Sequence, residues 1–143
     1  MQIIKNNQLI ENHWTFLEDE APVVAGSICV SLARWNAEKE QLSKHAGNLG
    51  VRISSTDDVS TLGADLGLFA LVELNVSNFT DGRSFSQAYL LRKRYGFQGE
   101  IRAVGSYLAD QVFYFSRVGV NGFNPENLQQ TYTTLQDFTV FYQ

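Results

Sequence analysis

Hydrophobic residues fall in short runs along this chain, and longer amphipathic stretches separate the runs. Two short apolar stretches flank Asn6 and Asn7, a pattern that predicts an N-terminal β-hairpin. An acidic link, EDEAP, follows, and from Val24 onward strand-like and helix-like segments alternate. The expected core strands are VVAGSICVSL at 23–32, LGVRISS at 49–55, LFALVELNV at 68–76, GEIRAVG at 99–105 and GVNGF at 119–123.

The stretches between these strands have the spacing of amphipathic helices. We expect a short helix in 56–67 capped by Thr56, a helix in 106–119 capped by Ser106, and a last helix opened by Pro125. The remaining helices are expected within ARWNAEKEQLSKHAG at 33–47 and NFTDGRSFSQAYLLRKRYG at 78–96.

This alternation predicts an α/β fold with a parallel β-sheet of about five strands and flanking helices, because parallel strands need crossover connections. Residues 1–143 are expected to form a single domain, with the hairpin and link in 1–22 and a βα core in 23–143. Two architectures fit. We favour an open doubly wound sheet over a half-barrel of βα units, which would pair with another copy as a homodimer.

Charge and cysteine content narrow the function classes. The net charge of −4 argues against nucleic acid as a partner, but between Asp65 and Phe123 six basic residues stand against five acidic ones, which permits a small anionic ligand. Cys29 is the single cysteine and lies in an apolar run, so we expect an inert thiol and no disulfide. The opening residues do not resemble a signal peptide, and no segment is long enough to cross a membrane, so we expect a cytoplasmic protein.

No metal site is expected, because His13 and His45 lack ligand spacing and one cysteine cannot build a cysteine-based centre. Nucleotide-binding glycine motifs and the nucleophile elbow are also missing. Any redox chemistry would therefore need an external cofactor, whose identity is unknown, and the sequence leaves open whether the protein is an enzyme.

The candidate site lies where two neighbouring strands end. NFTDGR follows one strand and VGS follows the next, and the carboxyl ends of parallel strands meet at one edge of a sheet. Two helix N-termini and one guanidinium there would suit an anion. The predicted ligand-binding residues are Thr80, Asp81, Gly82, Arg83, Ser84, Arg102, Gly105 and Ser106.

Structural explanations stand beside this hypothesis. Asp81 followed by Gly82 is a common turn pair, and Ser84 could act only as a helix cap. Arg102 lies within a strand, where pairing with a neighbouring acid is favoured over ligand binding. Arg92, Lys93 and Arg94 read as the solvated face of their helix.

Two strings in this region carry a family resemblance: FTDGR-x-x-S-x-A-x-x-LR from Phe79 and G-x-x-GE-x-RAVG from Gly96. With the N-terminal IIKNNQLIENHWTFLEDEAP, the chain resembles, over nearly its whole length, an uncharacterised bacterial domain-of-unknown-function family labelled as oxidoreductases involved in sulfite reduction. The positions carried over from the family are Phe79, Thr80, Asp81, Gly82, Arg83, Ser86, Arg92, Gly99, Glu100, Arg102, Gly105, Asp110 and Gln111. The chain departs from the family pattern at Ala109 and Val118.

The resemblance implies a role in assimilatory sulfur metabolism. The first hypothesis is an accessory protein that binds a small anion, or an enzyme partner such as sulfite reductase, at the loop of Asp81 and Arg83. The second is an oxidoreductase with an external cofactor, in which Asp81 is the general acid or base and Arg83 or Arg102 stabilises negative charge. The third is a protein-interaction module without a ligand, which uses part of the chain's aromatic content.

Overall fold

The computed structural model of the chain describes residues 1–78 and 82–141, with side chains described up to Asp137. The strands are β1 (Gln2–Lys5), β2 (Gln8–Glu11), β3 (Trp14–Leu17), β4 (Ser27–Ser31), β5 (Leu49–Ser54), β6 (Leu71–Val76), β7 (Glu100–Gly105) and β8 (Gly122–Pro125). The α-helices are α1 (Leu32–Leu42), α2 (Arg83–Lys93), α3 (Val112–Arg117) and α4 (Leu128–Phe141), and the 3₁₀ segments are η1 (Val59–Leu68) and η2 (Ala109–Gln111).

All of these strands belong to one sheet, in the order β2-β1-β8-β7-β6-β5-β4-β3. Strands β3 to β8 are parallel to their neighbours, whereas the β1–β2 hairpin joins β8 in antiparallel orientation. The sheet is therefore mixed and larger than the five parallel strands expected. Asn6 and Asn7, with φ values of 51° and 65°, form the left-handed turn that closes the predicted hairpin.

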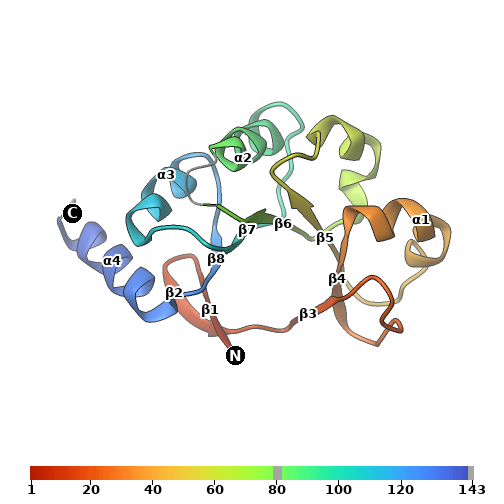
Figure 1. The fold of residues 1–143 in the computed structure, drawn as a ribbon, viewed down its shortest axis with the longest axis horizontal. Helices are drawn as coiled ribbons and strands as arrows, with labels where there is room; N and C mark the ends of the chain where they lie inside the picture. Colours follow the sequence, from red (N-terminus) through yellow and green to blue (C-terminus); the bar gives the residue numbers. More distant parts are fainter. Residues whose placement is uncertain (79–81, 142–143) are drawn as a thin grey trace.

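The parallel strands follow one another in chain order, so the favoured doubly wound sheet is wrong and the half-barrel alternative is correct. A doubly wound sheet needs a point at which the strand order reverses, and here it does not reverse. Right-handed crossovers that always advance in one direction leave their helices on one face of the sheet. Figure 1 shows these helices outside the curved row of strands.

A short link enforces the curvature. Strands β2 and β3 lie at opposite ends of the sheet, yet only Asn12 and His13 separate them in the chain. Three Cα–Cα steps span at most about 11 Å. The two ends of the sheet must therefore approach each other, and Figure 1 shows the strands in a curve whose open side is bridged by the link from the β1–β2 hairpin to β3.

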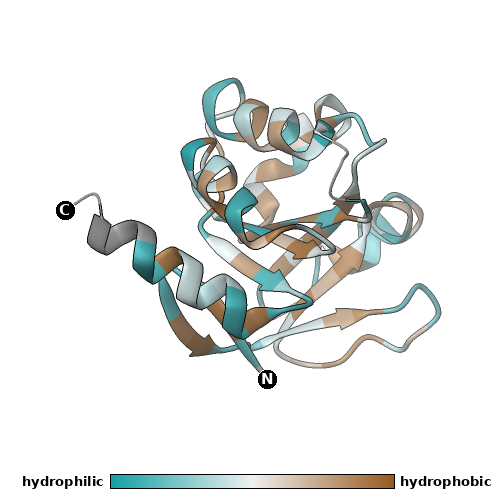
Figure 2. Cartoon of the chain, turned by 60° about the vertical axis from the view of Figure 1, so that its left-hand side comes forward, coloured by the Kyte–Doolittle hydropathy of each residue, from teal (hydrophilic) through white to brown (hydrophobic). Residues whose placement is uncertain are grey.

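The main hydrophobic core lies between the convex face of the sheet and the helices. Alternate strand residues such as Val51, Ile53 and Leu74 point toward the helices and are at most 1% exposed. Trp35 of α1 and Phe115 of α3 pack into the same core. Figure 2 shows hydrophobic residues gathered where strands and helices meet. The intervening residues of the same strands must therefore point to the concave face.

Strand β3 was not predicted from the sequence, and three helices start at other residues than expected. Strand β3 pairs with β4 rather than extending the hairpin. Asp58, not Thr56, caps η1, because its carboxylate accepts a hydrogen bond from the amide of Ser60 at 2.9 Å.

Ser106 and Pro125 do not begin helices either. The backbone N–H of Ser106 donates to the carbonyl of Val76 at 2.8 Å, which extends the pairing of β6 and β7, and helical structure begins only at η2. Pro125 is the last residue of β8, and α4 begins after Asn127, whose side chain accepts from the amide of Gln130 at 3.3 Å.

Gly105, at the end of β7, offers a test of this packing. Its φ of 108° is unfavourable for other residues, and an added Cβ would lie 2.4 Å from the carbonyl oxygen of Val76. We expect Gly105→Ala to lower the free energy of unfolding by about 1–3 kcal/mol, measured by urea denaturation. Gly67→Ala is the matched control, because no atom lies within 4 Å of its added Cβ. Equal stability of the two variants would contradict the close approach.

Candidate functional site

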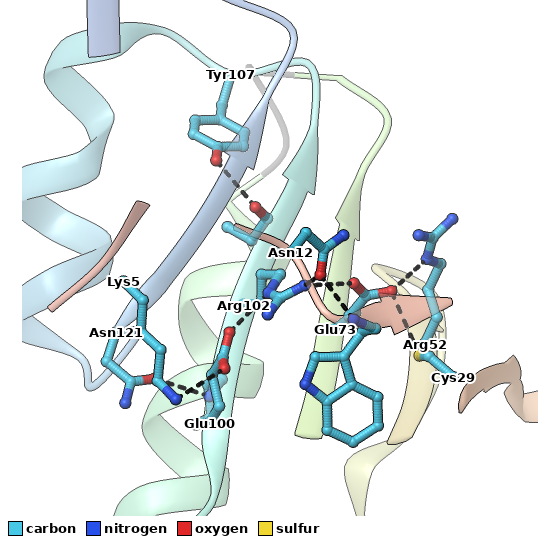
Figure 3. Close-up of polar contacts among 12 residues, drawn as sticks. Lys5, Asn12, Cys29, Arg52, Glu73, Glu100, Arg102, Tyr107 and Asn121 are labelled. Carbon is cyan, nitrogen blue, oxygen red and sulfur yellow. Dashed lines mark hydrogen bonds and ion pairs between the residues drawn. The ribbon is translucent and has the colours of Figure 1, made fainter. Parts of the chain in front are cut away.

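A row of charged residues crosses the concave face of the sheet. Arg52 of β5, Glu73 of β6 and Arg102 of β7 occupy neighbouring positions in the strand register. Arg52 Nε lies 2.9 Å from Glu73 Oε1, Arg102 Nη1 lies 3.8 Å from Glu73 Oε2, and Arg102 Nε lies 2.6 Å from Glu100 Oε2. Lys5 Nζ continues the row at 3.4 Å from Glu100 Oε1. Figure 3 shows this charged row, in which cations and carboxylates alternate.

Burial makes this pairing necessary. Glu73, Glu100 and Arg102 are 3%, 7% and 1% exposed, and an unpaired charge at such a position would be strongly destabilising. Asn12, in the link between β2 and β3, supplies a neutral partner: its Oδ1 accepts from Arg102 Nη1 and from the Trp14 amide, each at 3.0 Å. The link that curls the sheet therefore also covers the charged row.

Cys29 lies beside this row, and its thiol is poorly reactive. Its Sγ donates to Glu73 Oε1 at 3.4 Å, and burial together with the nearby Glu73 carboxylate raises the pKa of the thiol well above its usual range. The thiol is therefore protonated at neutral pH. This agrees with the inert thiol expected from the sequence.

Arg52 is the end of the charged row that reaches solvent. Its side chain is 26% exposed, and its guanidinium carbon lies 3.6 Å from the centre of the Phe16 ring. Figure 3 shows the terminal nitrogens pointing away from Glu73. Within residues 1–78 and 82–141 these nitrogens have no hydrogen-bond partner. The contacts to Glu73 and Phe16 thus hold the guanidinium in place while its two terminal amino groups stay available.

Arg52 lines a cleft of about 880 Å³. Other lining residues come from the last positions of β4, β5 and β6 and from the segments that follow β3 and β5, among them Asp19, Ser31, Ser54, Asp57 and Asn75. The cleft therefore opens at the carboxyl end of the parallel strands, where open α/β proteins bind their ligands. Its volume lies in the range of small-molecule sites.

The residues predicted from the sequence lie partly at this end of the sheet. Gly82 is the N-cap residue of α2, Arg83 is exposed at the first position of that helix, and Ser84 is buried. Gly105 and Ser106 lie at the end of β7, the strand next to β6. The Ser106 hydroxyl already has a partner, because it donates to Glu126 at 2.7 Å. Thr80 and Asp81 lie outside the described residues.

Arg102, in contrast, lies in the middle of β7, away from the carboxyl end of the strand. Its guanidinium is paired with Glu100 and Glu73, the kind of pairing that the sequence favoured. Arg92 is not a purely solvated residue, because its guanidinium donates to the carbonyls of Phe97, Gly99 and Gly119 at 2.7–3.0 Å. Both arginines therefore hold the fold together.

Sequence reasoning did not identify Arg52, Glu73 or the acidic side of the cleft. A signal was present, because LGVRIS and LVELNV each place one charged residue among apolar ones within a core strand, and EIRAVG places two. In the described part of the chain, no group of three or more His, Cys, Asp or Glu side chains could hold a metal ion. Nor does the described chain contain a helix long and apolar enough to span a membrane.

A curled sheet of βα units with a polar cleft at the strand carboxyl ends defines this chain as an α/β half-barrel protein. The family described as bacterial protein of unknown function (DUF934) matches residues 50–143, and the chain belongs to that family. The match runs from β5 to the end of α4, and it confirms the family relationship expected from the sequence. No curated protein matches the chain.

The buried thiol and phenol predict an alkaline weakening of the fold. Burial raises the pKa of Cys29 and of Tyr107, whose hydroxyl donates to the Ala103 carbonyl at 2.9 Å. Both groups keep their protons longer in the folded state, so their contribution is complete at neutral pH; that of Cys29 is lost as the pH rises above about 8.5 and that of Tyr107 above about 10. We expect urea denaturation to show a decline of up to about 1.4 kcal/mol per pH unit for each group. Cys29→Ala and Tyr107→Phe should each flatten the decline; an unchanged slope in both would refute the assignment.

The charged row predicts a large cost for removing its central cation. Arg102→Met leaves Glu73 and Glu100 buried with fewer partners, and we expect the free energy of unfolding to fall by about 3–5 kcal/mol. Arg94→Met, at an exposed position, is the control and should change stability by no more than about 0.5 kcal/mol. Adding Glu100→Gln to Arg102→Met should restore part of the loss. Denaturation curves that coincide for all variants would contradict the pairing.

Proposed function

We propose that the protein is a cytoplasmic accessory protein of assimilatory sulfite reduction that binds a small anionic ligand at the carboxyl end of its sheet. The observation that carries the binding proposal is the position of Arg52, which lines the cleft and whose terminal nitrogens have no hydrogen-bond partner in the described chain. The connection with sulfite reduction rests on the resemblance carried by the FTDGR and GEIRAVG strings.

Arg52 suits an anion because it is already oriented. Its Nε is bound to Glu73 and its plane packs on Phe16, so little side-chain freedom remains to be lost on binding. The two terminal amino groups can donate parallel hydrogen bonds to two oxygens of a carboxylate or a sulfur oxyanion. The charged row behind Arg52 contains two cations, Arg102 and Lys5, and two carboxylates, Glu73 and Glu100, so it is neutral and leaves the charge of Arg52 uncompensated.

Helix α2, which begins at Arg83, is attached to the edge of the cleft. Gln87, one turn further along α2, donates through Nε2 to the carbonyls of Ser54 at 2.7 Å and Asp57 at 2.9 Å. Both Ser54 and Asp57 line the cleft, so α2 is tied to its edge. This neighbourhood supports a role for Arg83 as a second contact for the ligand or for a protein that receives it.

Thermal-shift measurements with sulfite, sulfate and adenylylated sulfate test the proposal. At a ligand concentration about 100 times Kd, binding should stabilise the parent protein by about 2.7 kcal/mol, a rise in Tm of several degrees. Arg52→Gln should abolish the shift and Arg83→Ala should reduce it. Arg94→Ala is the control and should keep the full shift. Equal shifts in all four proteins, or none in the parent, would refute the anion site.

One further observation favours a second candidate, the protein-interaction module. Tyr89 of α2 and Tyr114 of α3 are 53% and 60% exposed, and Phe85 and Val118 form an apolar groove beside Tyr89. Exposed tyrosines and nearby arginines are common at protein interfaces. Co-purification with sulfite reductase that survives Arg52→Gln but is lost in a Tyr89→Ala, Tyr114→Ala double variant would favour this role, and sedimentation would show whether a second copy occupies the surface instead.

A further inference from the structure

We infer that the ligand of the cleft is a small zwitterion of the free amino acid class, bound with its carboxylate on Arg52 and its ammonium group beside Asp19. The inference rests on the proposed function, because it takes the cleft as the binding site and narrows the kind of ligand. It goes beyond a simple anion by assigning a role to the acidic side of the cleft.

The charge of the cleft is the first argument. Glu18, Asp19, Glu20 and Asp57 line it together with one cation, Arg52, so its net charge is −3. A sulfur oxyanion on Arg52 would meet repulsion from these carboxylates, since they line the same cleft. A ligand that carries its own positive charge turns that repulsion into attraction.

The second argument is the position of one carboxylate relative to Arg52. Ser31 of β4 lies opposite Arg52 in the strand register, and its hydroxyl donates to Asp19 Oδ1 at 2.6 Å. This hydrogen bond holds Asp19 at the strand position next to Arg52, and both residues line the cleft without forming an ion pair within the described residues. Asp19 Oδ2 and the terminal nitrogens of Arg52 both lack partners in the described chain. An acceptor and a pair of donors, on two residues that line the same cleft, are thus left without partners in the described chain.

The other acids are less suited to the ammonium group. Asp57 uses its Oδ2 on the amide of Ser54 at 2.8 Å and on the Ser54 hydroxyl at 3.2 Å, so it serves the turn after β5. Glu18 and Glu20 flank Asp19 on the exposed link and strengthen the negative potential around it. Asn75 at the end of β6 lines the same cleft and provides a neutral amide for further hydrogen bonds.

The experiment uses the full chain and ligands that differ by one charge. The twenty common amino acids are screened by thermal shift, and the best binder is compared by calorimetry with its N-acetyl derivative, which lacks the ammonium group, and with its amide, which lacks the carboxylate. We expect each derivative to bind about tenfold more weakly or worse, as expected for the loss of a charge-assisted hydrogen bond.

Variants then assign each charge to its residue. Asp19→Asn should remove the preference for the free amine over the N-acetyl derivative and leave the preference for the carboxylate. Arg52→Lys, which keeps the charge without the paired donors, should weaken binding of the amino acid more than binding of its amide. Asp110→Asn, at an exposed position outside the cleft, is the control and should change neither preference.

The outcomes separate the two proposals. If sulfite or sulfate stabilises the protein through Arg52 but no amino acid does, the zwitterion is refuted and the anion site stands. If amino acids bind and Asp19→Asn leaves both preferences intact, the assigned orientation is refuted. If neither class binds the parent protein, both proposals fail.

Discussion

Two residues, Asn12 and His13, join the strands at opposite ends of the sheet, and much of the structure depends on this constraint. The sheet has to curl, so its concave face becomes narrow and is covered by the link itself. Any charge on that face then loses solvent and needs a partner. Asn12 serves both the link and the buried charges. Its side-chain oxygen accepts from the Trp14 amide, next to the link, and from Arg102 in the middle of the sheet.

The charged row explains why a ligand would bind at the carboxyl end of the parallel strands and not on the concave face of the sheet. Closed βα barrels fill their interior with layers of branched apolar side chains. Here the comparable layer is polar, and its members Glu73, Glu100 and Arg102 are buried and occupied with one another. Among the described residues of this row, Arg52 is the one that lines the cleft, and its terminal nitrogens have no partner there while its Nε is bound to the buried Glu73. The buried ion pairs therefore orient one residue, Arg52, at the edge of the concave face.

The sequence predicted most elements because their apolar period is local, and it predicted the hairpin because asparagines tolerate the left-handed turn at Asn6 and Asn7. Strand β3 was missed because four residues, WTFL, carry no local mark of their parallel partners, such as Trp14 with Ser27. Arg102 was expected to pair with an acid, and it does. The grouping of Arg52 with Glu73 and the cleft could not be predicted, because it depends on strand order and register, which are set by long-range pairing. The role of Thr80 and Asp81 stays a prediction.

The cleft and the surface of α2 are physically connected, and this bears on how both could serve one function. Two hydrogen bonds from Gln87 hold α2 to the carbonyls of Ser54 and Asp57 at the edge of the cleft. On the same buried side of α2, Ser84 Oγ and Gln87 Oε1 have no partner within the described residues. Buried polar atoms without partners weaken the attachment of a segment. A ligand that contacts Ser54 or Asp57 would therefore change the hydrogen bonds that hold α2 in place. The same helix carries Arg83 and the exposed Tyr89.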